Sequence, residues 1–441
     1  MEISLPHNDM FDLDMLRSLE INNKTSKRAQ PGKSLISQNN RKLKRPQRPS
    51  PFHVALSSAL STLPPNIFSV PEITDSAFIS DPTTPKSYTI YSPLLLFPTG
   101  SFSSPQWQRL LNFLKSDRIR NNEFWEAVAK GMRVSHLAIN APIPVADAES
   151  HMDNYKRLPI SLHPLYGFFG PHLPDSRFPS SEDFNQAFWV HARQNGIFQT
   201  WAPIYTMFSR GNITEKTRIL KGELPGLDRG KDLGETAAVD LYIGIGYFSF
   251  CYLKAEKANV TRVWGWEVSP WSVEGCKRGA KGNGWRCQIV SHSDSNVEMP
   301  KPTSSKEKEN KEKEPEIVIF HEDNKYAAER ITALRIMVKE GGGYWRPIRH
   351  VNCGLLPTSR GSWETAVKVL DDELGGWVHA HENVGVNEVE IQKDEVQKAF
   401  EGLAGPDREV EVVGGVKVKG WAPGVLHWVW DISISGRKCK T

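Results

Sequence analysis

The segment Val239–Phe250 constrains the fold of this chain more than any other part of it. It takes an apolar strand into two glycines, Gly244 and Gly246, and then into a helical pattern. Because glycine has no Cβ atom, the backbone there can turn tightly and approach a ligand closely. A second apolar run, Arg262–Glu267, ends on a carboxylate 21 residues after Gly246. The order of strand, glycine turn, helix, strand and acid predicts a Rossmann-type unit.

The glycine pattern also bears on the ligand of this unit. Gly246 is followed by Tyr-Phe-Ser, so the third glycine of the dinucleotide fingerprint is missing. Glu267 has the spacing at which Rossmann-type units bind the hydroxyl groups of a ribose. A nucleoside without a pyrophosphate therefore fits better, and S-adenosylmethionine (SAM) is the candidate. A nicotinamide dehydrogenase is a weaker alternative, and a β-hairpin with a glycine turn and a surface glutamate is the non-functional one.

Size and composition set the class of protein. At 441 residues the chain has room for two or three domains, and 39% apolar with 24% charged residues is typical of a soluble globular protein. No apolar run approaches the roughly 20 residues that cross a bilayer, and the start lacks a secretory signal. The five cysteines form no CxxC pair, which favours reduced thiols over disulfides or a metal site. We expect a cytoplasmic protein without a bound metal.

Three regions follow one another along the chain. Residues 1–50 are expected to form a disordered basic arm, because nine Lys or Arg and no acid lie between Lys24 and Arg48. The arm could bind phosphates or direct localisation, or it could be a solubilising tail. Residues 51–205 alternate short apolar runs with Pro and Ser breaks, and predict a smaller N-terminal α/β domain. Residues 206–441 predict the Rossmann-like domain.

In this C-terminal region, strands alternate with helices. The expected strands are 239–245, 262–267, 316–321, 350–356 and 377–381, followed by 409–419 and 425–434. Alternation predicts a mostly parallel sheet covered on both faces. The last two strands have no helix between them and predict an antiparallel edge, as in the Rossmann-like sheet of SAM-dependent transferases. A low-complexity Lys/Glu insert at 293–316 predicts a solvated loop.

Polar residues end three of the predicted strands. In open parallel sheets, ligands bind beyond the carboxyl ends of the strands. Gly244 with Gly246, Glu267, and Asp323 with Asn324 are therefore candidate binding residues. Asp323 could accept a hydrogen bond from an adenine amino group and Asn324 could contact the ring nitrogens. Alternatively, Asp323 only caps a turn.

A second candidate cluster lies upstream of the glycines. Asn212 and Glu215 have the spacing of a helical capping box. Ser209, Arg210 and Lys216 lie around the predicted start of that helix. Together they would make a pocket for a carboxylate or a phosphate. The alternative is an ordinary surface helix.

Several motifs, occurring in one order over roughly residues 135–435, resemble the tRNA wybutosine-synthesis aminocarboxypropyltransferases. This family is kin to the tRNA guanosine methyltransferases. The matching segments are 138–144, 164–171, 199–216, 240–248, 322–324, 350–357 and 377–384.

The resemblance implies a reaction and a set of roles. SAM would donate its 3-amino-3-carboxypropyl group to the tricyclic base 4-demethylwyosine of phenylalanine tRNA, leaving methylthioadenosine. It implies that Ser209 and Lys216 hold the amino-acid end of SAM, Glu267 the ribose, and Asp323 with Asn324 the adenine. Arg210 would act catalytically on the target base or its phosphate. It also places residues 51–205 on the side of the tRNA.

The resemblance is incomplete in two places, and other functions remain open. Lys325 stands where the family usually has arginine, and Ser269-Pro270 where Asn-Pro is common. Without the resemblance, the residues do not distinguish aminocarboxypropyl from methyl transfer, so a tRNA guanosine methyltransferase is the first alternative. A nonenzymatic tRNA-binding protein with a relic nucleotide fold is the second.

Overall fold

The computed structural model describes residues 50–64, 75–140, 162–174, 177–227, 234–255, 258–291, 314–341 and 343–438. The expected basic arm lies outside these ranges except for Ser50, and so does the expected insert up to residue 313. The described residues belong to one compact unit, Ser50–Thr441. The boundary near residue 205 therefore stays a prediction. Among the described helices, none has the length and apolar character that a membrane span requires.

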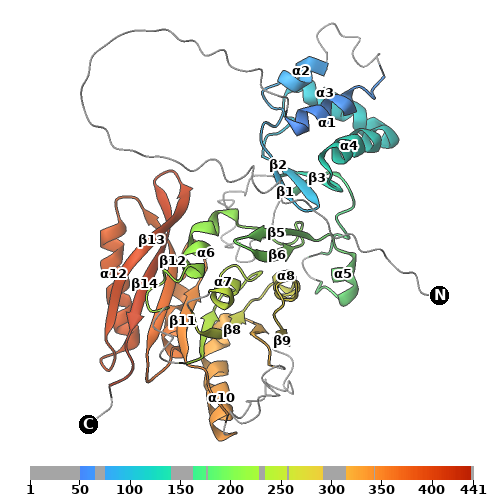
Figure 1. The fold of residues 1–441 in the computed structure, drawn as a ribbon. Coiled ribbons are helices and arrows are strands. Elements are labelled where there is room, and N and C mark those ends of the chain that lie inside the picture. The colour runs from blue at the N-terminus through green and yellow to red at the C-terminus, as the bar shows by residue number, and fades with distance from the viewer. Residues whose placement is uncertain are drawn as a thin grey trace, which may run out of the picture. The chain divides into compact units, whose positions relative to one another are not determined.

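An eight-stranded sheet organises the C-terminal part of the chain (Figure 1). The strand order is β13-β14-β12-β11-β7-β8-β10-β9. Neighbours from β12 to β9 run parallel, whereas β14 is antiparallel to β12 and β13 is antiparallel to β14. The bounds are β7 Thr236–Asp240, β8 Val260–Trp266, β9 Cys287–Ser291, β10 Ile317–His321, β11 Ile348–Cys353, β12 Gly376–Gly385, β13 Val410–Ala422 and β14 Val425–Ile434. The predicted fold class, a mostly parallel sheet with an antiparallel edge, is confirmed.

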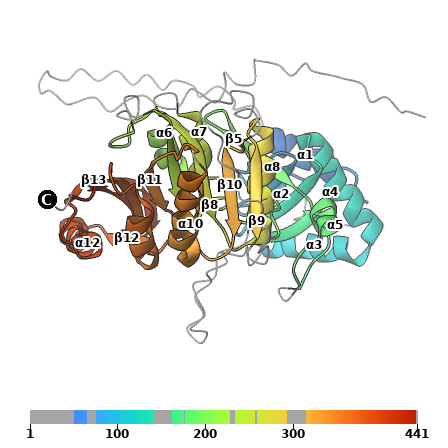
Figure 2. The same ribbon diagram turned by 90° about the horizontal axis from the view of Figure 1, so that it is seen from below.

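Helices cover both faces of this sheet, as Figure 2 shows with α6 and α7 on one side and α10 and α12 on the other. Ile219, Phe250 and Cys276 bring α6, α7 and α8 into one buried cluster. Ile331 and Phe400 belong to the cluster that brings in α10 and α12. The bounds are α6 Ile213–Leu220, α7 Ser249–Lys254, α8 Pro270–Gly282, α10 Ala327–Glu340, α11 Trp363–Val369 and α12 Val389–Ala404, with 3-10 turns η3 Arg210–Asn212, η5 Asn324–Tyr326 and η6 Arg360–Ser362.

A second, four-stranded sheet lies in the N-terminal part, with the order β1-β2-β3-β4. Its core is rich in aromatic rings: Phe97, Phe102 and Trp107 are buried and contact one another edge-on. The bounds are α1 Pro51–Leu60, α2 Asp75–Ser80, β1 Thr89–Tyr91, β2 Leu94–Phe97, α3 Pro105–Ser116, α4 Arg118–Met132, β3 His136–Asn140 and β4 Leu162–Tyr166. The predicted N-terminal α/β character is therefore present.

A short helix and a β-hairpin connect these two parts of the sequence. They are α5 (Ser181–Gln186), β5 (Val190–Gln194) and β6 (Ile197–Trp201). Asn195 and Gly196 form the two-residue turn, with φ of 51° and 72°, as a type I′ turn requires. Sequence reasoning did not predict this hairpin, although Asn-Gly between alternating residues is a strong signal for one.

The strand order reverses at β7, which defines where a ligand can bind. The chain passes from β7 to β8 and β10 on one side, and then from β11 to β12 on the other. In open α/β sheets, such a reversal is where a ligand is expected to bind, in a crevice beyond the carboxyl end of the strand. The sequence placed this strand at Val239–Ile245, but it ends at Asp240. Leu241, Ile243 and Ile245 are nevertheless buried, because the loop that follows β7 packs into the core. Its alternating apolar residues therefore have the sequence pattern of a strand.

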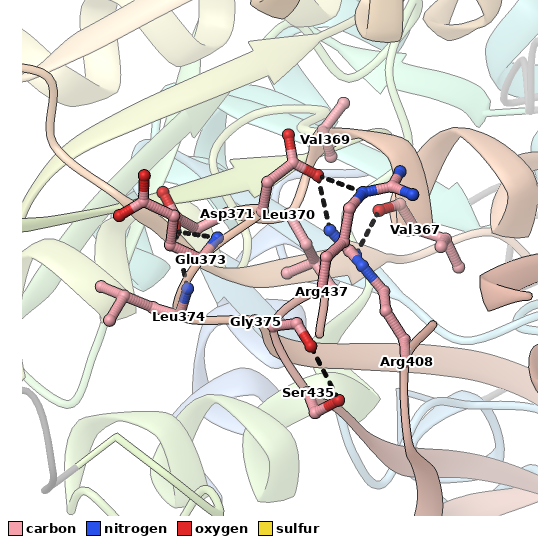
Figure 3. Close-up of polar contacts among 12 residues, drawn as sticks. Val367, Val369, Leu370, Asp371, Glu373, Leu374, Gly375, Arg408, Ser435 and Arg437 are labelled. Carbon is pink, nitrogen blue, oxygen red and sulfur yellow. Dashed lines mark hydrogen bonds and ion pairs between the residues drawn. The ribbon is translucent and has the colours of Figure 1, made fainter. Parts of the chain in front are cut away.

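Arginine side chains surround one carboxylate just before β12, at the amino ends of the parallel strands (Figure 3). Arg408 and Arg437 both donate to Asp372 Oδ1, at 2.7 and 3.0 Å, and Arg335 lies 3.3 Å from Oδ2. Asp371 accepts from the backbone N–H groups of the loop that leads into β12. These contacts fix the end of the chain after β14 to the start of β12, and we assign them a structural role.

Candidate active site

The loop after β7, residues 241–248, is called here the glycine turn. Gly244 and Gly246 adopt φ of +54° and +83°, a left-handed conformation that L side chains rarely adopt. A Cβ atom on Gly246 would lie 2.4 Å from the ring of Phe250 in α7. The turn thus requires glycine there both for its backbone angle and for its packing on the next helix.

A buried acid, Asp240, holds the base of the glycine turn. Its carboxylate accepts from Ser249 Oγ at 2.8 Å, Asn352 Nδ2 at 3.2 Å and the Tyr242 N–H at 3.3 Å. These donors come from α7, β11 and the turn itself. Burial raises the pKa of Asp240 to about 6, although the three hydrogen bonds favour the ionised form. Asp240 therefore ties together the two strands that flank the crevice.

Glu267 lies directly after β8 and faces the glycine turn. Its Oε2 accepts from the N–H of Gly244 at 3.0 Å, and its Oε1 accepts from the N–H of Ser269 at 2.7 Å. Ser269 caps α8, and Pro270 begins it, as the sequence predicted. Burial raises the pKa of Glu267 to about 7, against the effect of the backbone N–H donors. The structure therefore brings together the acid and the glycines that the sequence paired.

Asp323 and Asn324 follow β10 at the same edge of the sheet. Asn324 Nδ2 donates to the carbonyl of Leu241 at 2.8 Å, so this side chain supports the glycine turn. Asp323 Oδ1 accepts from the Lys325 N–H at 2.9 Å, so it caps η5. Half of the Asp323 side chain remains exposed, and its Oδ2 lies 3.9 Å from Lys325 Nζ. The capping role weighed in the sequence is therefore present, and a ligand role is compatible with it.

Lys216 of α6 is a buried cation between two glutamines and two aromatic rings. Its Nζ donates to Gln194 Oε1 at 2.9 Å and to Gln199 Oε1 at 2.6 Å, both on the β5–β6 hairpin. The rings of Phe208 and Tyr247 lie 5.1 and 4.9 Å away. No carboxylate among the described residues lies within ion-pair distance of it. Burial lowers the pKa of Lys216 to about 8.

Ser209 and Arg210 lie just before α6, where the glycine turn contacts them. The Ser209 N–H donates to Tyr247 Oη at 3.1 Å, and Tyr247 Oη donates to the Met207 carbonyl at 2.7 Å. The exposed Arg210 instead donates to Thr89 Oγ1 of β1 at 3.3 Å. Ser209 and Lys216 thus converge on Tyr247, whereas the Arg210 side chain extends toward the N-terminal sheet.

The predicted capping box at the start of α6 is wrong. Asn212 makes no capping hydrogen bond and instead accepts from Ser209 Oγ at 3.0 Å. Glu215 is fully buried and receives two hydrogen bonds from Arg218, at 2.9 and 2.8 Å. The reason is that a buried guanidinium needs carboxylate partners, and this need outweighs a backbone N–H at the helix start.

A buried polar network continues from Arg218 into the sheet. Asp431 of β14 accepts from Arg218 and lies 2.7 Å from His379 Nδ1. His379 Nε2 lies 3.1 Å from His350 Nδ1. Burial and the neighbouring His379 lower the pKa of His350 well below its usual range. The network joins α6 to β14, β12 and β11, and thereby fixes the helix that carries Lys216.

Replacing Gly246 with alanine should destabilise the protein by about 1–3 kcal/mol, because the new Cβ overlaps the Phe250 ring and strains the backbone. Gly424 provides the control: its φ is +75° and nothing lies within 4 Å of an added Cβ. Gly424→Ala should therefore cost only the backbone strain, about 1 kcal/mol. Urea unfolding would measure both. Equal losses would mean that the glycine turn has room for a side chain.

No family model matches the chain. Two curated relatives match over most of its length. The chain is 38% identical over 348 residues to tRNA wybutosine-synthesizing protein 2 of Schizosaccharomyces pombe, covering 79% of this chain and 72% of that protein. It is 30% identical over 391 residues to the protein of the same name from Saccharomyces cerevisiae, covering 79% of this chain and 74% of that one.

Among solved structures, one similar to this chain is P. horikoshii TYW2 in complex with MeSAdo. The identity is 16%, the TM-score is 0.49, and the match covers 84% of this chain and 98% of that one. This likeness is too distant to bear on the chemistry of the site. The family of this chain is shown by the two relatives at 38% and 30% identity.

Proposed function

Because this chain belongs to the tRNA wybutosine-synthesizing protein 2 family, we propose that it is a SAM-dependent tRNA aminocarboxypropyltransferase. It transfers the 3-amino-3-carboxypropyl group of SAM to 4-demethylwyosine, the tricyclic base next to the anticodon of phenylalanine tRNA. The products are the alkylated base and methylthioadenosine. The enzyme acts in the cytoplasm and uses no metal.

The observation that best supports this proposal is the buried ammonium of Lys216. Burying a charge without an opposite charge is costly, and both hydrogen-bond acceptors of Lys216 among the described residues are neutral amides. An anionic ligand would remove this cost. The α-carboxylate of SAM is such an anion, and Lys216 lies against Tyr247 of the glycine turn. Ser209, which contacts the same tyrosine, would bind the amino-acid end together with Lys216.

The remaining site residues would bind the nucleoside. Gly244 and Gly246 let the backbone approach the ligand closely. Glu267 accepts hydrogen bonds from the ribose hydroxyls, as acids at this strand end do in Rossmann-type sites. The Asp323 carboxylate, whose side chain is half exposed, accepts a hydrogen bond from the adenine amino group. Asn324 supports the glycine turn and contacts the adenine ring.

The mechanism then depends on the pose of the donor. The base carbon attacks the methylene carbon next to sulfur, and that carbon–sulfur bond breaks with its electron pair going to sulfur. The base carbon then loses its proton to solvent water, and methylthioadenosine leaves as a neutral thioether. The sulfonium activates its methyl group equally well, so orientation decides which carbon reacts. Lys216 and Ser209 would hold the chain toward the base, and Arg210 would act on the base or its phosphate.

The experiment that tests the proposed function is analysis of both products. The full chain is incubated with SAM and with phenylalanine tRNA isolated from cells that lack this protein. Chromatography should show methylthioadenosine, and mass spectrometry should show the aminocarboxypropyl group on the tRNA. S-adenosylhomocysteine with a methylated base would instead indicate a tRNA guanosine methyltransferase. Neither product, with no SAM binding, would indicate a nonenzymatic tRNA-binding protein.

Replacing Lys216 with methionine should weaken SAM binding about tenfold, as loss of a charged hydrogen bond to the carboxylate would. The matched control is Lys221→Met, because Lys221 directly follows α6 and its side chain is exposed. Titration calorimetry should show wild-type affinity for the control. Decarboxylated SAM should bind the Lys216 variant and the wild-type protein equally well. Unchanged SAM affinity of the Lys216 variant would contradict the assignment.

A further inference from the structure

The hairpin of β13 and β14 brings the antiparallel edge of the sheet to the proposed active site. β13 contacts both α6 and η3, and Figure 1 shows the hairpin in red beside α6 in green. Lys216 lies in α6, and Arg210 lies in η3. The hairpin turn at Pro423 and Gly424 follows directly on the end of β13.

One lysine of the hairpin is fixed against the loop that carries Ser209. Lys419 Nζ donates to Ser209 Oγ at 3.4 Å. The aliphatic part of Lys419 packs on Gly211, where an added Cβ would lie 2.6 Å from Lys419 Cδ. The same ammonium lies 5.7 Å from the centre of the Trp421 ring. Lys419 therefore connects the proposed site to an indole on the hairpin.

Trp421 itself faces solvent, with 45% of its surface exposed. Tryptophan is usually well buried, so an exposed indole beside a binding site points to a ligand. The hairpin around it carries two cations, Lys417 and Lys419, and no acid from residue 412 to residue 426. A flat aromatic ring beside positive charges is the combination that binds single-stranded nucleic acid, through base stacking and phosphate neutralisation.

We propose that Trp421 stacks on an unpaired base of the substrate tRNA beside the target nucleotide, with Lys419 neutralising a neighbouring phosphate. This inference rests on the proposed function and names how the RNA is held. The positive charge of the hairpin favours RNA over an apolar protein partner. A second copy of the chain could instead pair with β13, which is an edge strand; that occupant is an outcome of the test.

The stacking is tested by binding of phenylalanine tRNA, isolated from cells that lack this protein, in the absence of SAM. Trp421→Leu keeps apolar bulk but removes the aromatic ring, and should weaken binding about tenfold. Trp421→Phe should stay within about threefold of wild type. Ile336→Ala is the control, since Ile336 is 52% exposed on α10, and should bind like wild type. Wild-type affinity of Trp421→Leu would overturn the proposal.

The charge contribution has a separate signature. Lys419→Met should reduce the slope of log affinity against log salt by about one, whereas Trp421→Leu should leave the slope unchanged. The control is Lys339→Met, because Lys339 lies at the end of α10, which leads to the amino end of β11, whereas the proposed site lies at the carboxyl ends of the parallel strands. An unchanged slope for Lys419→Met would overturn its role at a phosphate.

Two further readouts separate this inference from the proposed function. Trp421→Leu should bind SAM like wild type, because the indole lies outside the proposed nucleoside contacts. If wild-type protein forms no methylthioadenosine but Trp421→Leu still weakens tRNA binding, the function fails while the RNA contact stands. If Trp421→Leu changes the oligomeric state in analytical ultracentrifugation and leaves tRNA binding intact, the hairpin binds a second copy and the RNA contact is refuted.

Discussion

Glu267→Ala is expected to weaken SAM binding ten- to a hundredfold, about 1.5–3 kcal/mol, because the proposed ribose hydrogen bonds to a carboxylate would be lost. The structure adds a second cause. The carboxylate also accepts from the N–H groups of Gly244 and Ser269, so its removal frees the glycine turn from the start of α8. Titration calorimetry measures the loss.

Two variants separate these causes. Glu267→Gln keeps the size of the side chain and one oxygen acceptor, which can retain the hydrogen bond from the Gly244 N–H but not also the one from Ser269. It should therefore disturb the turn less than alanine does and still lose a large part of the affinity. Glu274→Ala, on the same side of the sheet in α8, is the control for removal of an acid. Its carboxylate pairs with Arg278 at 2.7 Å, away from the glycine turn, and its loss should leave SAM affinity unchanged. Wild-type affinity of Glu267→Ala would refute the ribose role.

The pKa of Glu267 gives the same prediction a pH dependence. Its pKa is raised to about 7 by burial, so below this value the carboxyl is protonated and is a poorer acceptor. SAM affinity should therefore fall as the pH drops below 7. Lys216, whose pKa is lowered to about 8, loses its charge above that value, so affinity should fall there too. Glu267→Gln should remove the acid limb of this profile and Lys216→Met the alkaline limb.

The nucleoside-binding part of the proposed site could be predicted because its residues lie close together in the sequence. Gly244, Gly246 and Glu267 sit within one strand–helix–strand unit, and their spacing directly reflects how such a unit turns. In the structure, the Gly244 N–H donates to Glu267, which joins the glycine turn to the acid. The sequence misplaced both ends of β7, which runs from Thr236 to Asp240 and not from Val239 to Ile245. Its end was placed too late because the buried loop residues continue the apolar pattern of the strand.

The part of the proposed site that would bind the amino-acid end of SAM could be predicted only in part, because its residues come from distant segments of the chain. Lys216 was identified, but its partners Gln194 and Gln199 lie on a hairpin that sequence reasoning overlooked. Asn195-Gly196 was the available signal for that hairpin. Asp240 was likewise passed over as a site residue, although it precedes the glycine turn. No periodicity indicates that its carboxylate reaches Asn352 in β11.

Arg218→Met is expected to reduce the free energy of unfolding by about 3–5 kcal/mol, the largest stability effect that the structure indicates. Arg218 pairs with Glu215 and Asp431, whose side chains are only 1% and 4% exposed. Methionine would fill most of the space but would leave two buried carboxylates without their cation. Urea unfolding measures the loss. The control is Arg360→Met, because the Arg360–Glu395 pair is 47% and 56% exposed and should contribute about 0.5 kcal/mol or less.

The pH dependence of that loss distinguishes stranded charge from lost packing. Without Arg218, burial should raise the folded-state pKa of Asp431 above its unfolded value. The folded variant then binds more protons than the unfolded chain, so its stability should fall as the pH rises. The loss should be smaller at about pH 5.5 than at about pH 8, and adding Glu215→Gln and Asp431→Asn should restore part of it. A loss that is equal at both pH values would mean that Arg218 acts through packing, and that the position of α6, with Lys216 on it, does not depend on this ion pair.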